Sequence, residues 1–350
     1  MPKKIYKVIQ WSSGNVGKAS IRGICNRSDL ELVGLIVSDE KKNGLDAGVI
    51  SGIDEIGVKA STNIDGVLSI EADCVNYTPL ASVRVGDDPD ADKKNILSLL
   101  KKGFNVVTTV GFLYPKAFGK DFEKEIEDAC LAGGSSLHGT GIAPGWLSDL
   151  VPLTMSGMSE EISQVKVTES SEFSYYASEE IVFDSMLMGK SLQQYEQESV
   201  RYEGWITGLF SEAIYLIADG IGSNILEIDK TVDLVTSDED REIAAGLVKK
   251  GTISGQRRKW VGKCDNDVEI IQEAIWRAYP DAAPEWDEPV GMCVEVKGKP
   301  NMKINFDHGW NDDPLVSTAL HGVHAIPMVC EASPGFKSFL DLPLISSKFN

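Results

Sequence analysis

The chain lacks the features that mark a membrane protein or a nucleic-acid-binding protein. No apolar run approaches the roughly 18 residues that a spanning helix needs. Residues 1–4 lead directly into a short apolar run without a signal-peptide core, so we expect a cytoplasmic protein. Basic residues are few, 34 against 53 acidic ones, and the net charge is −19. Such a chain repels nucleic acid and anionic membranes, and we expect neither as a partner.

Cysteine and histidine are also scarce and scattered. The six cysteines form no C-x-x-C pair, and the four histidines do not stand at metal-ligand spacing from them. We therefore expect no metal site, and we interpret most of the cysteines as reduced, buried, small apolar residues.

The length favours two domains. A chain of 350 residues with 42% hydrophobic residues is long enough to bury two cores. We predict a dinucleotide-binding domain over residues 1–150 and an α+β domain for substrate binding and dimerisation over 151–312. We expect residues 313–350 to return to the first domain.

The first domain opens on a strand–turn–helix pattern. The apolar residues 5–11 end in a small-residue turn that leads into a helical pattern. Gly14 and Gly17 match the second and third glycines of the G-x-G-x-x-G dinucleotide fingerprint, and the small residue Ser12 holds the first position. Because a helix amino terminus stabilises a phosphate, we assign the cofactor phosphates to Ser12, Ser13, Gly14, Asn15, Val16 and Gly17. A plain turn with two glycines is the alternative.

Strand and helix patterns alternate through the first domain and predict a Rossmann-like, doubly wound parallel sheet. We expect its strands at residues 5–11, 30–37, 58–60, 72–79, 104–109 and 135–141. The second domain shows alternating polar and apolar residues, which predict a mixed or antiparallel sheet. Its expected strands are 161–173, 225–235, 251–261 and 290–306, and its expected helices are 191–197, 205–220 and 267–279. A further helix is expected at 315–323. The polar run 256–259 is interpreted as a solvated strand face, with binding of a carboxylate as the alternative.

The second strand ends without the acid that binds the ribose in many NAD enzymes. Val37 holds that position and Ser38 follows, Asp39 lies two residues late, and Lys41 and Lys42 come after it. Lysines there suit the 2′-phosphate of NADP, so we favour NADP over NAD as the cofactor. A solvated loop is the alternative interpretation of these lysines.

Ligands of doubly wound folds lie beyond the carboxyl ends of the strands. This rule places the nicotinamide near the residues that end the fourth, fifth and sixth strands, namely Tyr77, Thr78, Pro79, Val110, Gly111 and Thr140.

Three side chains are candidate proton donors: His138, Tyr175 and Tyr176. Phe112, Trp146 and Phe173 are candidates for an apolar substrate pocket. For each of these residues, an ordinary structural role is the alternative.

Four segments together resemble one family. They are residues 8–17, residues 45–48, residues 139–146 with the sequence Gly-Thr-Gly-Ile-Ala-Pro-Gly-Trp, and residues 324–330 with Ser333-Pro334-Gly335. The chain is similar to the dihydrodipicolinate-reductase-like superfamily, in the branch of 2,4-diaminopentanoate dehydrogenase and the native NAD(P)-dependent amine dehydrogenases. The resemblance implies a Rossmann-like domain, a C-terminal α+β domain, a homodimer, and hydride transfer between NAD(P)H and the carbon of a small imine, carbonyl or amine compound.

The chain departs from this family at one place. The amine dehydrogenases carry a glutamate in the loop after the fifth strand, which is thought to hold the ammonium or the nascent amine. Residues 108–115 contain no acid here, although a carboxylate is the natural partner for a cationic amine in a desolvated pocket. A ketone, an aldehyde or a preformed imine, reduced without ammonia, is therefore an alternative substrate.

Two other functions remain open. An acylating semialdehyde dehydrogenase needs a reactive cysteine, for which Cys130 and Cys264 are unconvincing candidates. A non-catalytic NAD(P)H-binding sensor predicts tight cofactor binding without turnover.

Overall fold

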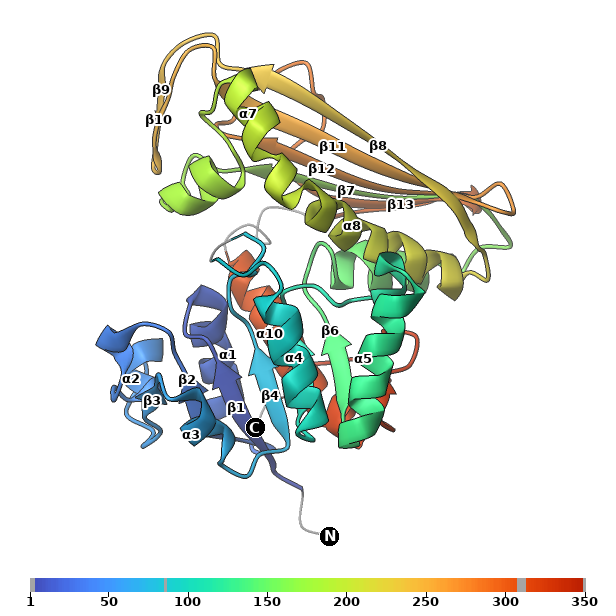
Figure 1. Ribbon diagram of the computed structural model, residues 1–350. Coiled ribbons are helices and arrows are strands. Elements are labelled where there is room, and N and C mark those ends of the chain that lie inside the picture. The colour runs from blue at the N-terminus through green and yellow to red at the C-terminus, as the bar shows by residue number, and fades with distance from the viewer. Residues whose placement is uncertain (1–3, 85–86, 307–312, 349–350) are drawn as a thin grey trace. The chain divides into compact units, whose positions relative to one another are not determined.

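The computed structural model describes residues 4–84, 87–306 and 313–348, and the chain divides into two compact units (Figure 1). Unit 1 comprises Met1–Trp146 with Asp313–Asn350, and unit 2 comprises Leu147–Asp312. Within the described ranges, no helix combines the length and the apolar character needed to cross a bilayer.

Unit 1 is built on a seven-stranded parallel sheet in the order β15-β6-β5-β4-β1-β2-β3. The strands are β1 (Tyr6–Trp11), β2 (Leu30–Ile36), β3 (Ala60–Ser61), β4 (Cys74–Tyr77), β5 (Asn105–Thr108), β6 (Ser136–Gly139) and β15 (Gly335–Phe336). The helices are α1 (Asn15–Cys25), η1 (Glu40–Lys42), α2 (Ala47–Ser51), α3 (Ile64–Leu68), α4 (Ala91–Lys101), η2 (Pro115–Phe118), α5 (Lys120–Gly133) and α10 (Pro314–Glu331). The predicted Rossmann-like sheet is therefore confirmed.

Helices cover both faces of this sheet. The chain passes from β1 through α1 to β2, and from β4 through α4 to β5, in opposite directions across the sheet. Because both crossovers are right-handed, α1 and α4 lie on opposite faces. Helices α4 and α5 pack together, whereas α10 lies beside α1 behind β1, β4, β5 and β6 (Figure 1). Gly23 allows the close approach of α1 and α10, since a Cβ there would lie 2.6 Å from Leu320 Cδ2. The C-terminal segment thus completes the core of unit 1.

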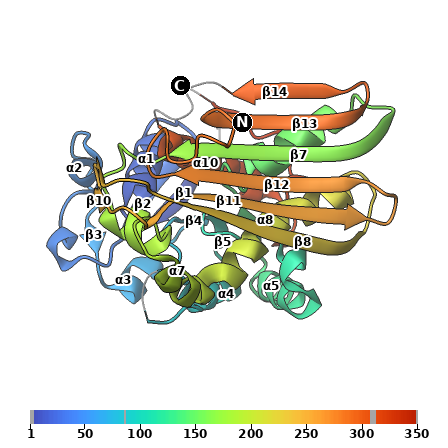
Figure 2. The same ribbon diagram turned by 90° about the horizontal axis from the view of Figure 1, so that it is seen from above.

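Unit 2 is built on a six-stranded mixed sheet in the order β14-β13-β7-β12-β11-β8 (Figure 2). Its strands are β7 (Glu161–Glu172), β8 (Ile225–Thr236), β11 (Ile253–Cys264), β12 (Glu269–Arg277), β13 (Gly291–Lys299) and β14 (Met302–Phe306), with a separate hairpin of β9 (Arg241–Ile243) and β10 (Gly246–Val248). Its helices are η3 (Trp146–Leu150), α6 (Val151–Ser156), η4 (Glu180–Ser185), α7 (Leu192–Glu198) and α8 (Val200–Gly220). The predicted mixed sheet is confirmed, with residues 290–306 forming two strands.

The core of unit 2 lies between the sheet and α8. The buried indole of Trp260 on β11 stacks on Phe210 of α8, with ring centroids 4.2 Å apart. Stacked aromatic rings stabilise a core beyond the area that they bury.

The helix predicted over residues 267–279 is wrong, because this segment forms the strand β12. Its apolar residues Ile270, Ile271, Ala274 and Ile275 recur at a spacing that suits one face of a helix. In the sheet, β12 lies between β7 and β11, and side chains on both of its faces are buried. A strand that is buried on both faces loses the polar–apolar alternation by which strands are recognised.

The solvated strand face predicted at residues 256–259 is wrong for Gln256 and Arg258, whereas Arg257 and Lys259 are partly exposed. Arg258 on β11 is fully buried, and its guanidinium donates to Glu203 of α8 at 2.7 Å and to the hydroxyl of Tyr195 at 2.5 Å. Gln256 is buried beside it and accepts a hydrogen bond from Arg258. The charge is buried because partners from α7 and α8 satisfy it, and these partners are distant in the sequence.

Candidate functional site

The turn between β1 and α1 leaves the amino terminus of α1 open. Gly14 is the N-cap residue, and in the described part of the chain no side chain caps this end and no acid lies in the first helical turn. The first N–H groups of a helix have no partner within the helix and carry partial positive charge. The residues present therefore fit a bound phosphate, which would occupy the place of a capping carboxylate.

Ser12 makes this turn in a left-handed backbone conformation, with φ of +85°. A Cβ at Gly17 would overlap the carbonyl oxygen of Ser12, so only glycine lets the helix start so close to the turn. At Gly14, in contrast, a Cβ would have no neighbour nearer than the Ser12 Oγ at 3.9 Å. The two glycines therefore differ: Gly17 serves packing, while the space at Gly14 is open to a ligand.

A lysine lies against this turn. The Nζ of Lys42 lies 3.1 Å from the Oγ of Ser13 and 3.4 Å from its carbonyl oxygen. The side chain of Asp39 accepts the backbone N–H of Lys41 at 2.9 Å and thereby caps η1. Lys41 and Ser38 are exposed. Of the two lysines considered from the sequence, Lys42 is the one that contacts the turn.

The end of β4 is held by buried hydrogen bonds. The Tyr77 hydroxyl donates to Asp92 Oδ1 at 2.7 Å, and its ring lies 5.1 Å from the ring of Trp11. Burial raises the pKa of Tyr77, so the phenol is neutral. Thr78 Oγ1 accepts a hydrogen bond from the side chain of Gln10 at 2.8 Å, and Pro79, which follows, is half-buried. Tyr77 thus supports the strand end.

The loop after β5 is apolar and tightly folded. Gly111 and Phe112 both have positive φ, and the buried ring of Phe112 stacks on Phe122 with centroids 5.7 Å apart. The N–H of Val110 donates to Thr108 Oγ1 at 3.3 Å, and the side chain of Val110 is buried. The loop therefore presents no charged group to a substrate.

The end of β6 contains two neighbouring polar side chains. Thr140 is buried, and its Oγ1 lies 2.7 Å from Nδ1 of His321 on α10. His138 is fully buried, and its Nδ1 donates to the carbonyl oxygen of Lys337 at 2.7 Å. Burial lowers the pKa of His138 to about 4. The neutral, buried imidazole of His138 binds the C-terminal segment at Lys337. We therefore favour a structural role of His138 over a role as proton donor.

The candidate proton donors of unit 2 differ in exposure. Tyr175 exposes 59% of its surface, whereas Tyr176 is half-buried and packs edge-on against Phe173, with ring centroids 6.3 Å apart. Phe173 itself packs against the core of unit 2. Trp146 begins η3 and is half-buried.

Neither cysteine proposed for acyl transfer has the properties of a nucleophile. Burial raises the pKa of the Cys130 thiol to about 12, and burial also raises the pKa of Cys264. Both thiols stay protonated at neutral pH, and the thiolate is the nucleophilic form.

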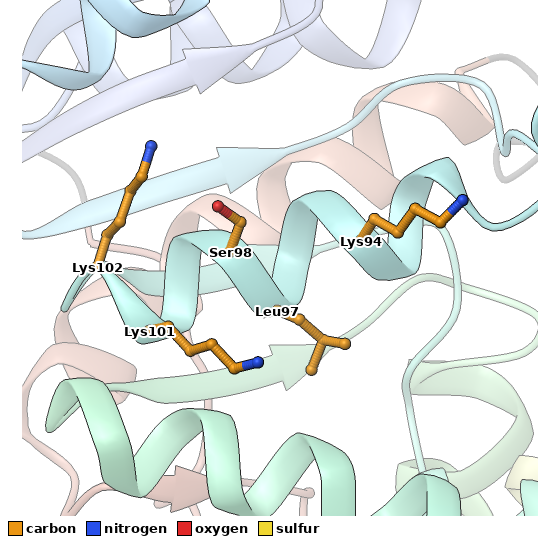
Figure 3. Close-up of a pocket in the computed structure, with 5 residues that line it drawn as sticks. All are labelled: Lys94, Leu97, Ser98, Lys101 and Lys102. Atoms are coloured by element: carbon orange, nitrogen blue, oxygen red, sulfur yellow. The ribbon is translucent and has the colours of Figure 1, made fainter.

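A pocket of about 420 Å³ lies along α4 (Figure 3). It is lined by Lys94, Leu97, Ser98, Lys101 and Lys102, and its lining includes none of the predicted cofactor residues. Figure 3 shows the lysine side chains spread along the helix, and Lys94 already pairs with Asp88 at 2.7 Å. We assign no function to this pocket.

The parallel sheet brings several of the predicted residues together at one edge. The carboxyl ends of β1, β4, β5 and β6 are adjacent, which places Ser12, Thr78, Val110 and Thr140 along that edge. The sequence did not distinguish Lys42 from Lys41, and Gln10, Asn76 and His321 were not predicted from it. No local pattern marks them, because each acts through a partner that the fold supplies.

The chain is similar in sequence and in fold to several known proteins. Residues 146–350 match the family model of the 2,4-diaminopentanoate dehydrogenase C-terminal domain. The chain is 29% identical to an amine dehydrogenase of Streptomyces virginiae over 96% of each chain. It is 25% identical to the 2,4-diaminopentanoate dehydrogenase of Acetoanaerobium sticklandii over 97% of this chain and 93% of the relative. Its fold is similar to that of an amine dehydrogenase from Mycobacterium smegmatis, with a TM-score of 0.80 and 17% identity over 98% of this chain and 97% of the other.

Proposed function

Because the chain belongs to the family of the 2,4-diaminopentanoate dehydrogenase C-terminal domain, we propose that it is a nicotinamide-dependent dehydrogenase acting on the carbon of a C=N or C=O bond. The observation that carries the cofactor assignment is the uncapped amino terminus of α1 beside Lys42. When bound, the nicotinamide supplies or accepts a hydride. Family membership favours this enzyme over a non-catalytic sensor.

The preferred cofactor is NADP. Support comes from Lys42, whose ammonium group lies against the turn, and from the absence of an acid at the end of β2, where Val37 and Ser38 stand. An acid at that place would repel a 2′-phosphate, while a lysine attracts it.

The proton that accompanies hydride transfer needs a donor, and two tyrosines of unit 2 are candidates. Of the two tyrosines considered, Tyr175 is the more exposed, whereas Tyr176 is held by Phe173. We therefore assign the donor role to Tyr175. A phenol hydroxyl can donate to a developing oxyanion or amine as the carbon is reduced.

The loop after β5 offers no carboxylate partner to a substrate nitrogen. This supports a substrate whose reacting group is neutral. Val110, Phe112 and Leu113 are buried, and residues 108–115 contain no acid. A cationic amine beside such a loop would lack the partner that desolvation requires. A neutral imine or carbonyl group suits this surface better, and Phe112 is then part of the apolar lining.

The proposal is tested by a panel of initial rates with NADPH and with NADH. Ketones and aldehydes are supplied with and without ammonia, and the reverse reaction uses NADP⁺ or NAD⁺ with simple amines and 2,4-diaminopentanoate. Turnover only with ammonia identifies an amine dehydrogenase, and turnover without ammonia identifies a carbonyl reductase. The proposal would be overturned if no carbonyl compound led to oxidation of NADPH or NADH and no amine led to reduction of NADP⁺ or NAD⁺.

We also propose that the protein is a cytoplasmic homodimer, as its resemblance to the amine dehydrogenases implies. Light scattering coupled to size exclusion measures the mass directly. A mass near 38.1 kDa, that of a single chain, would contradict the dimer.

A further inference from the structure

The phosphate-binding turn contains a strained residue. Ser12 has φ of +85°, where the fingerprint normally has glycine. A side chain with a Cβ is disfavoured in this region, and such a conformation persists only when surrounding groups hold it.

The side chain of Gln10 contacts both peptide groups that flank Ser12. Its Nε2 lies 3.1 Å from the carbonyl oxygen of Trp11 and 3.1 Å from that of Ser12. The same nitrogen lies 2.8 Å from Thr78 Oγ1. Gln10 is fully buried, so water does not compete for these acceptors.

Asn76 fixes which end of the Gln10 amide faces the turn. It lies opposite Gln10 in the pairing of β1 with β4, and its Nδ2 donates to Gln10 Oε1 at 2.7 Å. The oxygen of the Gln10 amide is thereby turned toward β4, and its nitrogen toward the carbonyl groups of the turn. Asn76 is also fully buried.

The start of α1 packs against the same group. A Cβ at Gly17 would overlap the Ser12 carbonyl oxygen and would lie 3.4 Å from Gln10 Nε2. The turn, the first turn of α1 and the Gln10 amide are therefore one packed unit, and a movement of one displaces the others.

From these contacts we infer that Gln10 is a positioning residue for cofactor binding. Its amide holds Ser12 in the left-handed conformation that leaves the amino terminus of α1 open to the pyrophosphate. Asn76 acts behind it by orienting that amide. The inference rests on the proposed function, because it concerns the same dinucleotide site.

A double-mutant cycle between Gln10 and Ser12 tests this inference. The full-length variants Gln10→Leu, Ser12→Gly and the double variant are titrated with NADPH by fluorescence, and their thermal midpoints are measured without cofactor. We expect Gln10→Leu to raise the Kd for NADPH at least tenfold. Because glycine adopts the left-handed conformation without strain, we expect added Ser12→Gly to recover most of that loss.

Gln272→Leu is the matched control. Gln272 is a buried glutamine on β12 that donates to the carbonyl oxygen of Ser148 at 2.9 Å, and it lies in unit 2. We expect it to lower the thermal midpoint and to leave the Kd for NADPH within about twofold. If Gln10→Leu does not yield folded protein, Asn76→Ala takes its place, with an expected three- to tenfold rise in Kd.

The outcomes separate this inference from the proposed function. Wild-type protein that binds neither NADPH nor NADH overturns both. Wild-type binding together with an unchanged Kd in Gln10→Leu, or with no recovery by Ser12→Gly, overturns the role of Gln10 alone. An equal rise in Kd for Gln272→Leu would also contradict it, because the effect would then be a general loss of stability.

Discussion

The ammonium nitrogen of Lys42 lies 3.1 Å from the hydroxyl oxygen of Ser13, so a cation from the loop after β2 contacts the turn after β1. The two residues are 29 positions apart, and the parallel pairing of β1 with β2 brings their carboxyl ends together. This contact joins the turn proposed to bind the cofactor phosphates to the loop proposed to bind the ribose.

Replacing Lys42 by alanine should weaken NADPH binding selectively. Loss of one charge-assisted contact to a 2′-phosphate should raise the Kd for NADPH by about 10- to 100-fold. The Kd for NADH should change by less than about threefold, because that coenzyme lacks the phosphate. Fluorescence titration measures both constants, with Lys41→Ala as the control. Equal losses of affinity for NADPH and for NADH would contradict the assignment of NADP as the cofactor.

The two glycines of the turn should respond differently to alanine. Gly17→Ala should lower both thermal stability and cofactor affinity, because its Cβ would overlap the Ser12 carbonyl oxygen. Gly14→Ala should leave the thermal midpoint nearly unchanged, since the site has space for a Cβ, yet raise the Kd for NADPH. Differential scanning fluorimetry with and without cofactor separates the two effects. A stable, tightly binding Gly17→Ala variant would refute the packing argument.

Tyr175→Phe should slow catalysis and spare cofactor binding. Loss of a general acid lowers kcat by about 10²- to 10⁴-fold. Tyr176→Phe, which keeps the ring that packs on Phe173, should stay within about threefold of wild type. Steady-state kinetics over a pH range, with NADPH affinity measured separately, checks both variants. Full activity of Tyr175→Phe would remove this residue from the mechanism.

Stability should fall as the pH is lowered from about 6.5 toward 4. Burial lowers the pKa of His138 to about 4, while an unfolded histidine titrates near 6.5. In this window the unfolded chain binds more protons than the folded one, so each pH unit lowers the free energy of unfolding by about 1.4 kcal/mol for this group. His138→Asn should reduce the slope of stability against pH, measured by urea denaturation. An unchanged slope would show that His138 is not the responsible group.

Breaking the ion pair between the buried Arg258 and the half-buried Glu203 should destabilise unit 2. Glu203→Gln leaves the guanidinium of Arg258 buried without its carboxylate, which costs about 3–5 kcal/mol. Lys263→Ala removes an exposed lysine paired with Glu227 and Asp229 and should cost less than about 1 kcal/mol. Urea denaturation measures the free energy of unfolding of both variants. Similar losses of this free energy would mean that the burial of Arg258 does not raise the cost of removing its partner.

Much of unit 1 could be predicted because its signals are local. The strand at Tyr6–Trp11, the turn and the helix from Asn15 follow one another within 20 residues, and each has its own pattern. The capping glycine Gly134, which ends α5 with φ of +66°, is a signal of the same kind. Such features depend on neighbours in the sequence and are therefore visible without the fold.

The errors fall where burial depends on distant partners. The carboxylate of Glu273 on β12 is almost fully buried and pairs with Lys166 on β7 and Arg257 on β11. Nothing near Glu273 in the sequence indicates these cations, so the burial of its carboxylate could not be predicted from the local pattern. The burial of Arg258 was missed for the same reason.

The sequence by itself determined the parallel sheet of unit 1, the position of the turn between β1 and α1 and the family resemblance, because each rests on short-range patterns. Only the tertiary structure decided that Lys42 contacts the turn, that Gln10 and Asn76 hold the strained Ser12, and that His138 is buried. These three outcomes depend on which strand ends lie side by side and on where α10 and the C-terminal segment pack. The residues in contact there are between 1 and 199 positions apart in the chain, and packing alone brings the distant ones together.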